Sequence, residues 1–150
     1  MIVYLDASAL VKQYVAETGS EAVGALIEAA DVVGTSLISR AEVVAALAKA
    51  VRVGLLERSE ASGARTIFAT QWSDVVRLQL TETVVTRAGD LAWEHDLRGY
   101  DAVHLAAALF WQETLGESVT MATFDRQLWE KGEQTGLAVW PPDLEKHTRR

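Results

Sequence analysis

Short runs of β-branched and aliphatic residues alternate along this chain with longer segments in which hydrophobic residues recur every three or four positions. The short runs predict five strands, at residues 2–5, 32–35, 75–80, 118–123 and 137–140. The longer segments predict seven helices, at residues 9–16, 20–30, 38–53, 59–72, 82–95, 100–114 and 125–135. This alternation is typical of an α/β domain with a mainly parallel sheet.

The length and composition predict one globular domain. The chain has 150 residues, of which 49% are hydrophobic and 23% charged, and it contains no internal repeat, low-complexity tract or flexible linker. Its two prolines, Pro141 and Pro142, end the last predicted strand. We therefore expect a domain over residues 1–140 and a short charged tail over residues 141–150.

No segment of the sequence has the pattern of a targeting signal or a membrane span. The apolar N-terminus reaches Asp6 without a basic leader, unlike a signal peptide. The longest apolar stretch, residues 102–111, includes His104 and is much shorter than the roughly 20 residues that cross a bilayer. The absence of cysteine excludes disulfides, thiolate zinc sites and a cysteine nucleophile. Together these features predict a cytoplasmic protein that does not bind membranes.

The charge balance limits the kinds of partner. The chain has 14 Lys and Arg against 21 Asp and Glu, which gives a formal net charge of -7. A charge of this sign opposes indiscriminate binding to nucleic acids and anionic membranes, because both are negative. Any contact with nucleic acid must therefore depend on a local site.

Four acidic residues stand at the ends of predicted strands or the beginnings of predicted helices. Asp6 follows the first strand, Glu42 lies early in the third helix, Asp101 opens the long apolar helix, and Asp125 follows the fourth strand. Open parallel sheets bind ligands at the carboxyl ends of their strands. We therefore expect these carboxylates to converge at one edge of the sheet.

Converging carboxylates repel one another, so a site that holds several of them favours a cation. Oxygen ligands without cysteine or a histidine cluster indicate a hard ion such as Mg²⁺ or Mn²⁺. Such an ion can bind a phosphate and activate a water molecule. The reaction that this site indicates is hydrolysis of a phosphodiester.

The same residues also allow a purely structural interpretation. Asp6, Asp101 and Asp125 all occupy positions typical of a helix N-cap, and Ser39 with Glu42 matches a capping box. From the residues alone both interpretations stay open. His104 lies on the same helical face as Asp101, but the burial expected for this helix favours a hydrogen-bonded core histidine.

Four segments together resemble a known family. They are residues 5–10 (LDASAL), 39–43 (SRAEV), 100–108 (YDAVHLAAA) and 123–125 (TFD). Their order and spacing resemble a PIN-domain ribonuclease and, more narrowly, the VapC toxins of toxin–antitoxin pairs. The resemblance covers about residues 1–140 and implies a PIN-like three-layer α/β/α domain with a mainly parallel sheet of about five strands.

The resemblance assigns roles to matching positions. It implies that Asp6, Glu42 and Asp101 hold a catalytic metal ion and its attacking water, and that Asp125 completes the pocket. The expected cofactor is Mg²⁺, for which Mn²⁺ can substitute.

Two hydroxyl residues and four cations accompany these acids. The resemblance gives Ser8 and Thr123 supporting roles through hydrogen bonds to carboxylates or metal-bound water. Basic residues near the acids in sequence are candidates for binding substrate phosphates, with solvated surface charge as the alternative for each. They are Arg40 and Arg126, which we favour, and Lys12 and Arg98.

The resemblance also implies partners. These are an RNA substrate, a cognate VapB-type antitoxin, and a second copy of the chain in a homodimer that can assemble further with antitoxin on operator DNA. Two other functions remain as alternatives. One is a non-catalytic PIN-like module that binds RNA or protein. The other is a haloacid-dehalogenase-type phosphatase, which needs a second aspartate at the position of Ser8.

Overall fold

The computed structural model describes residues 1–145 and contains one five-stranded sheet, in which every strand pair is parallel. The strands are β1 (Ile2–Leu5), β2 (Val32–Ser36), β3 (Val76–Leu78), β4 (Val119–Ala122) and β5 (Ala138–Trp140). The α-helices are α1 (Ala7–Leu10), α2 (Ser20–Ala29), α3 (Ser39–Arg52), α4 (Arg58–Gln71), α5 (Glu82–His95), α6 (Gly99–Leu115) and α7 (Arg126–Gln134). The predicted five-stranded α/β fold is therefore confirmed.

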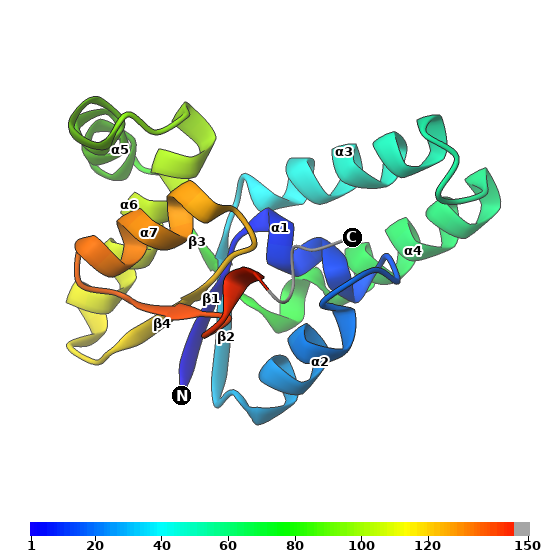
Figure 1. The fold of residues 1–150 in the computed structure, drawn as a ribbon, viewed down its shortest axis with the longest axis horizontal. Coiled ribbons are helices and arrows are strands. Elements are labelled where there is room, and N and C mark those ends of the chain that lie inside the picture. The colour runs from blue at the N-terminus through cyan, green and yellow to red at the C-terminus, as the bar shows by residue number, and fades with distance from the viewer. Residues whose placement is uncertain (146–150) are drawn as a thin grey trace.

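Helices cover both faces of the sheet, which gives three layers. Figure 1 shows α5, α6 and α7 on one side of the strands and α1 to α4 on the other. Side chains of β1 alternate between the layers: Val3 and Leu5 pack toward α1 to α4, whereas Tyr4 packs toward α5, α6 and α7.

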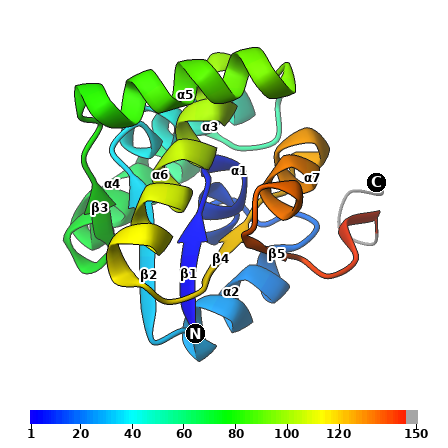
Figure 2. The ribbon, with the colours of Figure 1, turned by 90° about the vertical axis from the view of Figure 1, so that its left-hand side faces the viewer.

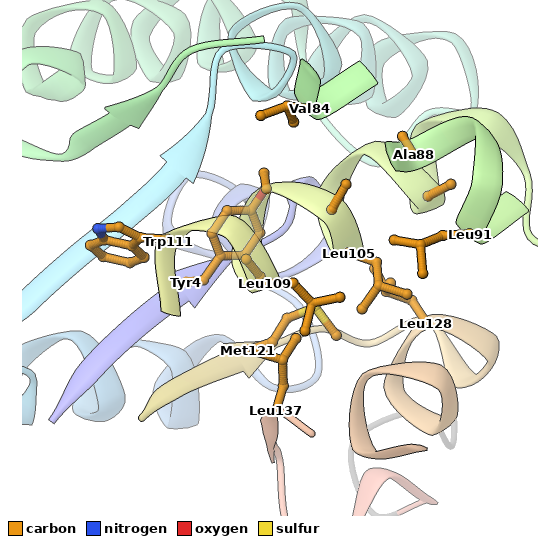
Figure 3. Close-up of a cluster of buried hydrophobic side chains, with 14 of the residues drawn as sticks. Tyr4, Val84, Ala88, Leu91, Leu105, Leu109, Trp111, Met121, Leu128 and Leu137 are labelled. Atoms are coloured by element: carbon orange, nitrogen blue, oxygen red, sulfur yellow. The ribbon is translucent and has the colours of Figure 1, made fainter. Parts of the chain in front are cut away.

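The helix α6 is central to one of these layers. Its middle is almost continuously apolar, and it packs against the sheet on one side and α5 on the other (Figure 2). Figure 3 shows Leu105 of α6 in one cluster with Tyr4 of β1 and Met121 of β4. All three side chains are fully buried. This packing fixes the beginning of α6, where Asp101 lies, relative to the strands.

The strand order β3-β2-β1-β4-β5 determines where a site can form. The chain fills one half of the sheet with β1, β2 and β3 and then the other with β4 and β5, so the direction of winding changes between β1 and β4. A crevice opens at such a switch point, outside the carboxyl ends of the strands. Leu5 and Ala122 form the last pair of the β1–β4 register. Asp6 and Thr123 are consequently the first residues beyond the paired strands.

Two predicted elements differ from the observed ones by more than two residues in total. The helix expected at residues 9–16 is the short helix α1 followed by a 3₁₀ turn, Val11–Gln13. After this turn, the Ser20 hydroxyl donates a hydrogen bond to the Val15 carbonyl and so ties the following loop to the beginning of α2. The strand expected at residues 75–80 extends only over Val76–Leu78, because β2 pairs with it over three residues.

The predicted tail is described only in part, since residues 146–150 lie outside the described residues. The boundary between the domain and the tail stays a prediction. Within the described part of the chain, no helix is both long and apolar enough to cross a membrane.

Candidate active site

A cavity of about 140 Å³ lies at the carboxyl ends of the strands. Its lining residues are Asp6, Ala7, Ser8, Glu42, Arg98, Tyr100, Asp101, His104 and Asp125. All four acids singled out in the sequence are among them. The expectation that these carboxylates converge at one edge of the sheet agrees with the structure.

Asp6 is the most enclosed of these acids, with 3% of its surface exposed. Its Oδ1 accepts hydrogen bonds from the Ala9 backbone N–H at 2.9 Å and the Ser8 hydroxyl at 2.7 Å, and its Oδ2 accepts from Thr123 Oγ1 at 2.5 Å. Burial raises the pKa of Asp6, while the nearby His104 and these hydrogen bonds act in the opposite direction. Asp6 therefore caps α1 and also places in the cavity a carboxylate whose ionised form is disfavoured by burial.

Ser8 and Thr123 join the loop after β1 to the loop after β4. Ser8 Oγ accepts a hydrogen bond from the Phe124 N–H at 3.0 Å, and Thr123 Oγ1 accepts one from the Asp125 N–H at 3.1 Å. Since both hydroxyls also donate to Asp6, they hold the first and last acids of the site in a fixed relation.

Asp101 and Asp125 share one arginine. Arg98 Nε donates to Asp101 Oδ2 at 3.0 Å, and Arg98 Nη2 donates to Asp125 Oδ2 at 2.7 Å. Burial raises the pKa of Asp101, and the charge of Asp125 raises it further, whereas Arg98 lowers it. Arg98 thus acts as the counter-charge of a carboxylate pair that would otherwise repel.

The capping interpretation holds for two of the acids. Asp6 caps α1, and Asp125 caps α7 by accepting from the Leu128 N–H at 2.9 Å. Asp101 instead lies inside the first turn of α6, for which Arg98 is the N-cap residue. N-cap roles and a place in the cavity are therefore compatible for Asp6 and Asp125.

The capping box predicted for Ser39 and Glu42 is wrong. Ser39 is already the first residue of α3, and its hydroxyl is paired with Thr35 Oγ1 at 2.6 Å. Glu42 extends from the first turn of α3 to His104, where its Oε1 lies 2.6 Å from the ring Nε2. The helix begins one residue earlier than a capping box with Ser39 as the N-cap requires, so Ser39 is not in the position to cap it.

The predicted phosphate-binding cations lie in different surroundings. Arg98 lines the cavity, whereas Lys12, Arg40 and Arg126 are not part of its lining. Lys12 Nζ binds Glu17 and the Thr18 carbonyl, Arg40 stacks over two aromatic rings of α4 and the following turn, and Arg126 pairs with Glu130 and Glu145. Arg98 is thus the cation best placed to meet a ligand in the cavity.

The cavity carries the donor set that a hard divalent cation prefers, namely carboxylate and hydroxyl oxygens. As the side chains stand, no three acidic or histidine groups within residues 1–145 are close enough together to chelate one ion. Arg98 already forms ion pairs with Asp101 and Asp125 but offsets only one of their two negative charges, and Glu42 is bound to His104. Burial raises the pKa of Asp6 and of Asp101, so an added positive charge nearby would favour their ionised forms.

Sequence analysis missed two features of this site. Tyr4 supports His104 from within β1, and Tyr100 lines the cavity. Tyr4 lies in a continuous apolar run, which indicates a core residue, so nothing local marks its hydroxyl as a hydrogen-bond partner. Tyr100 directly precedes Asp101 at the beginning of α6, and this adjacency was the available signal.

The fold and the acidic cavity define a nuclease-like α/β domain, and comparison with known proteins gives its family. Residues 3–133 match the PIN domain family. The chain belongs to this family, whose ribonucleases are generally dependent on divalent metal ions.

Individual relatives agree with this assignment. The chain is 40% identical over 145 residues to Ribonuclease VapC45 of Mycobacterium tuberculosis (strain CDC 1551 / Oshkosh), covering 96% of this chain and 98% of that protein. The predicted resemblance to VapC-type PIN ribonucleases is confirmed.

Solved structures share the fold. A toxin–antitoxin complex from Klebsiella pneumoniae matches with a TM-score of 0.65 and 17% identity over 94% of this chain and 98% of that chain. VapBC2 from Rickettsia felis, bound to a DNA fragment from its promoter, matches with a TM-score of 0.64 and 14% identity over 94% of this chain and 100% of that chain. At these identities the likeness supports the three-layer fold alone.

Proposed function

We propose that this chain is a divalent-metal-dependent endoribonuclease that acts as the toxin of a VapBC-type pair. The observation that carries the proposal is the convergence of Asp6, Glu42, Asp101 and Asp125 around one cavity in a PIN domain whose curated relative is a ribonuclease. These four acids come from four separate parts of the chain, and their mutual repulsion is unfavourable without a cation.

The four acids are the residues that would hold the cofactor, which we propose to be Mg²⁺ with Mn²⁺ as a substitute. When bound, the ion supplies Lewis acidity toward a phosphate and lowers the pKa of a bound water. Asp6 is kept in place by Ser8 and Thr123, so its carboxylate needs little reordering. In the overall reaction, water attacks phosphorus and the bond from phosphorus to one ribose oxygen breaks.

Phosphate binding is the role we propose for Arg98. Of the Lys and Arg side chains in the described part of the chain, Arg98 alone lines the cavity, and its own side chain is 55% exposed. A guanidinium can pair with two phosphate oxygens at once. Arg40, Arg126 and Lys12 are proposed as outer contacts to the RNA backbone, which extends beyond the cavity.

We further propose a cognate VapB-type antitoxin, a homodimer and a larger complex on operator DNA as the partners of this chain. Large aromatic side chains are exposed on α5 and α6, including Trp93 with 91% and Phe110 with 43% of its surface accessible. Exposed apolar surface of this kind is typical of protein contacts. The proposed setting is the cytoplasm, where the RNA substrate lies.

The two alternatives have less support. Membership of the PIN family leaves the phosphatase interpretation without a basis, and the position that would need its second aspartate holds Ser8, which donates to Asp6. A non-catalytic module has no need for four carboxylates in one small cavity, because their repulsion lowers stability without a compensating ligand.

RNA cleavage by a charge-neutral variant tests the proposal. Purified wild type and Asp101→Asn are incubated with total RNA and Mg²⁺ or Mn²⁺, and new RNA ends are sequenced. We expect cleavage by the wild type and a loss of at least a hundredfold in Asp101→Asn. Asp90→Asn, an exposed acid of α5, is the matched control and should retain activity. Equal activity of Asp101→Asn and wild type would refute the metal site, and an inactive wild type would favour the binding module.

A further inference from the structure

His104 is a buried histidine whose two ring nitrogens both have partners. It is 1% exposed. Nδ1 lies 2.7 Å from the Tyr4 hydroxyl, and Nε2 lies 2.6 Å from Oε1 of Glu42. The three residues come from β1, α6 and α3, so this chain of hydrogen bonds connects the sheet to both helical layers.

The chemistry of the end groups sets the direction of these bonds. A carboxylate only accepts, so Nε2 donates its proton to Glu42. Burial raises the pKa of the Tyr4 phenol, which therefore keeps its proton and can donate it to Nδ1. The tyrosine thus favours the ring tautomer that presents N–H to Glu42.

Packing alone does not explain an imidazole at this position. The residues that follow His104 in α6, Leu105 to Ala108, are all buried and apolar, and an apolar side chain would fill the same layer. A buried polar group lowers stability unless every hydrogen bond is made. The complete pairing of His104 therefore points to a function for the group at the end of the chain of bonds, which is Glu42.

The carboxylate of Glu42 has no other hydrogen-bond partner among the described residues. Its side chain is 25% exposed and lines the cavity, so without His104 it would be free to adopt several rotamers. The bond to His104 uses Oε1 and leaves Oε2 without a hydrogen bond from that part of the chain. One oxygen of Glu42 is thus anchored and the other remains available to a ligand.

We propose that His104, itself oriented by Tyr4, is a positioning residue that holds Glu42 ready for the divalent cation of the active site. The inference rests on the proposed function. Removal of a group that orients a metal-binding carboxylate typically lowers metal affinity or activity by about 10- to 100-fold.

Calorimetric titration of the metal-free protein with Mn²⁺ measures this role without depending on catalysis. His104→Met keeps side-chain bulk but removes both hydrogen bonds, and we expect it to raise the Kd for Mn²⁺ about tenfold or more. His104→Gln can place an amide N–H near the position of Nε2 and should recover part of the affinity. Tyr4→Phe removes a single hydroxyl and should give an intermediate loss.

A packing control separates positioning from general damage to α6. Leu109→Met changes a buried apolar side chain of the same helix that has no part in the hydrogen bonds between Tyr4, His104 and Glu42. The Mn²⁺ affinity of this variant should equal that of the wild type. RNA cleavage by the same variants should lose kcat with little change in KM, because the substrate contacts are intact.

The failure of this inference is distinguishable from failure of the proposed function. Glu42→Gln serves as the reference: if it binds Mn²⁺ as tightly as the wild type, the proposed metal site is wrong. If Glu42→Gln loses affinity while folded His104→Met and Tyr4→Phe keep it, the positioning role is wrong and the metal site stands. Equal losses in His104→Gln and His104→Met would also overturn the positioning role, since the donated hydrogen bond would then be irrelevant.

Discussion

Arg98 and Asp125 are joined by a hydrogen bond of 2.7 Å between Nη2 and Oδ2, although 26 residues separate them along the chain. The same guanidinium binds Asp101 through Nε. One cation therefore occupies the side of the cavity where two of the four acids face each other. A divalent ion that binds these acids has to compete with this internal counter-charge.

Removal of the guanidinium should strengthen cation binding. In Arg98→Gln the two acids lose their shared positive partner, and we expect the Kd for Mn²⁺ to fall several-fold at low ionic strength, as measured by calorimetric titration. Arg87→Gln is the matched control, because Arg87 makes a two-point ion pair with Glu113 outside the cavity. Unchanged or weaker Mn²⁺ binding in Arg98→Gln would show that Arg98 does not compete with the divalent ion.

The metal-free protein should be stabilised at neutral pH by Asp6→Asn. Burial raises the pKa of Asp6 in the folded protein, so the fold favours the protonated form; this contribution is complete below the unfolded pKa of about 3.9 and is lost as pH rises through the folded pKa. The variant keeps an oxygen for the Ala9 N–H. In urea denaturation, the free energy of unfolding of Asp6→Asn should exceed that of the wild type by an amount that grows from pH 4 toward about pH 7.

Asp31→Asn provides a control of opposite sign for this pH series. The N-terminal amine lowers the pKa of Asp31, so its carboxylate contributes stability that is present above the unfolded pKa and lost as pH falls. The free energy of unfolding of Asp31→Asn should therefore drop below that of the wild type as pH rises. Parallel pH profiles for the wild type and Asp6→Asn would contradict the raised pKa of Asp6.

The sequence was sufficient for those parts of the site that depend on strand ends. Asp6 and Thr123 follow two hydrophobic runs, and parallel pairing of these runs brings both residues to one edge whatever the details of packing. Asp101 could be placed too, because it begins a long apolar helix that has to lie on the sheet.

The contacts of Glu42, Arg98 and His104 could not be derived in this way. Each depends on how α3 and α6 are oriented across the end of the sheet, and the local pattern around Glu42 fitted a capping box equally well. The sequence placed Arg98 three residues before Asp101, but its second bond, to Asp125, requires α7 to begin beside α6. Such relations come from how whole helices pack around the ends of the strands, which no local spacing encodes.

The Thr123 hydroxyl should matter for stability as well as for the site. Thr123→Val keeps the shape of the side chain but removes the donor to Asp6 Oδ2 and the acceptor of the Asp125 N–H, both at a position with no exposed surface. We expect a loss of about 1–3 kcal/mol in the free energy of unfolding. Thr123→Ser retains the hydroxyl and should lose much less, and equal losses in the two variants would point to the methyl group instead.

The close approach of α6 to β2 gives a test of the fold that is independent of the acids. A Cβ added at Gly34 would lie 2.7 Å from Cη2 of Trp111, which is itself buried against the sheet. The indole cannot retreat without disturbing the layer between α6 and the strands, so Gly34→Ala should destabilise the protein by about 1–3 kcal/mol in urea denaturation. Gly89→Ala, on the exposed side of α5 with no atom in the way, should instead stabilise it by roughly 0.5–1 kcal/mol. If Gly34→Ala were neutral while Gly89→Ala behaved as expected, α6 would have to pack farther from β2 than described, and the position of Asp101 at the site would need revision.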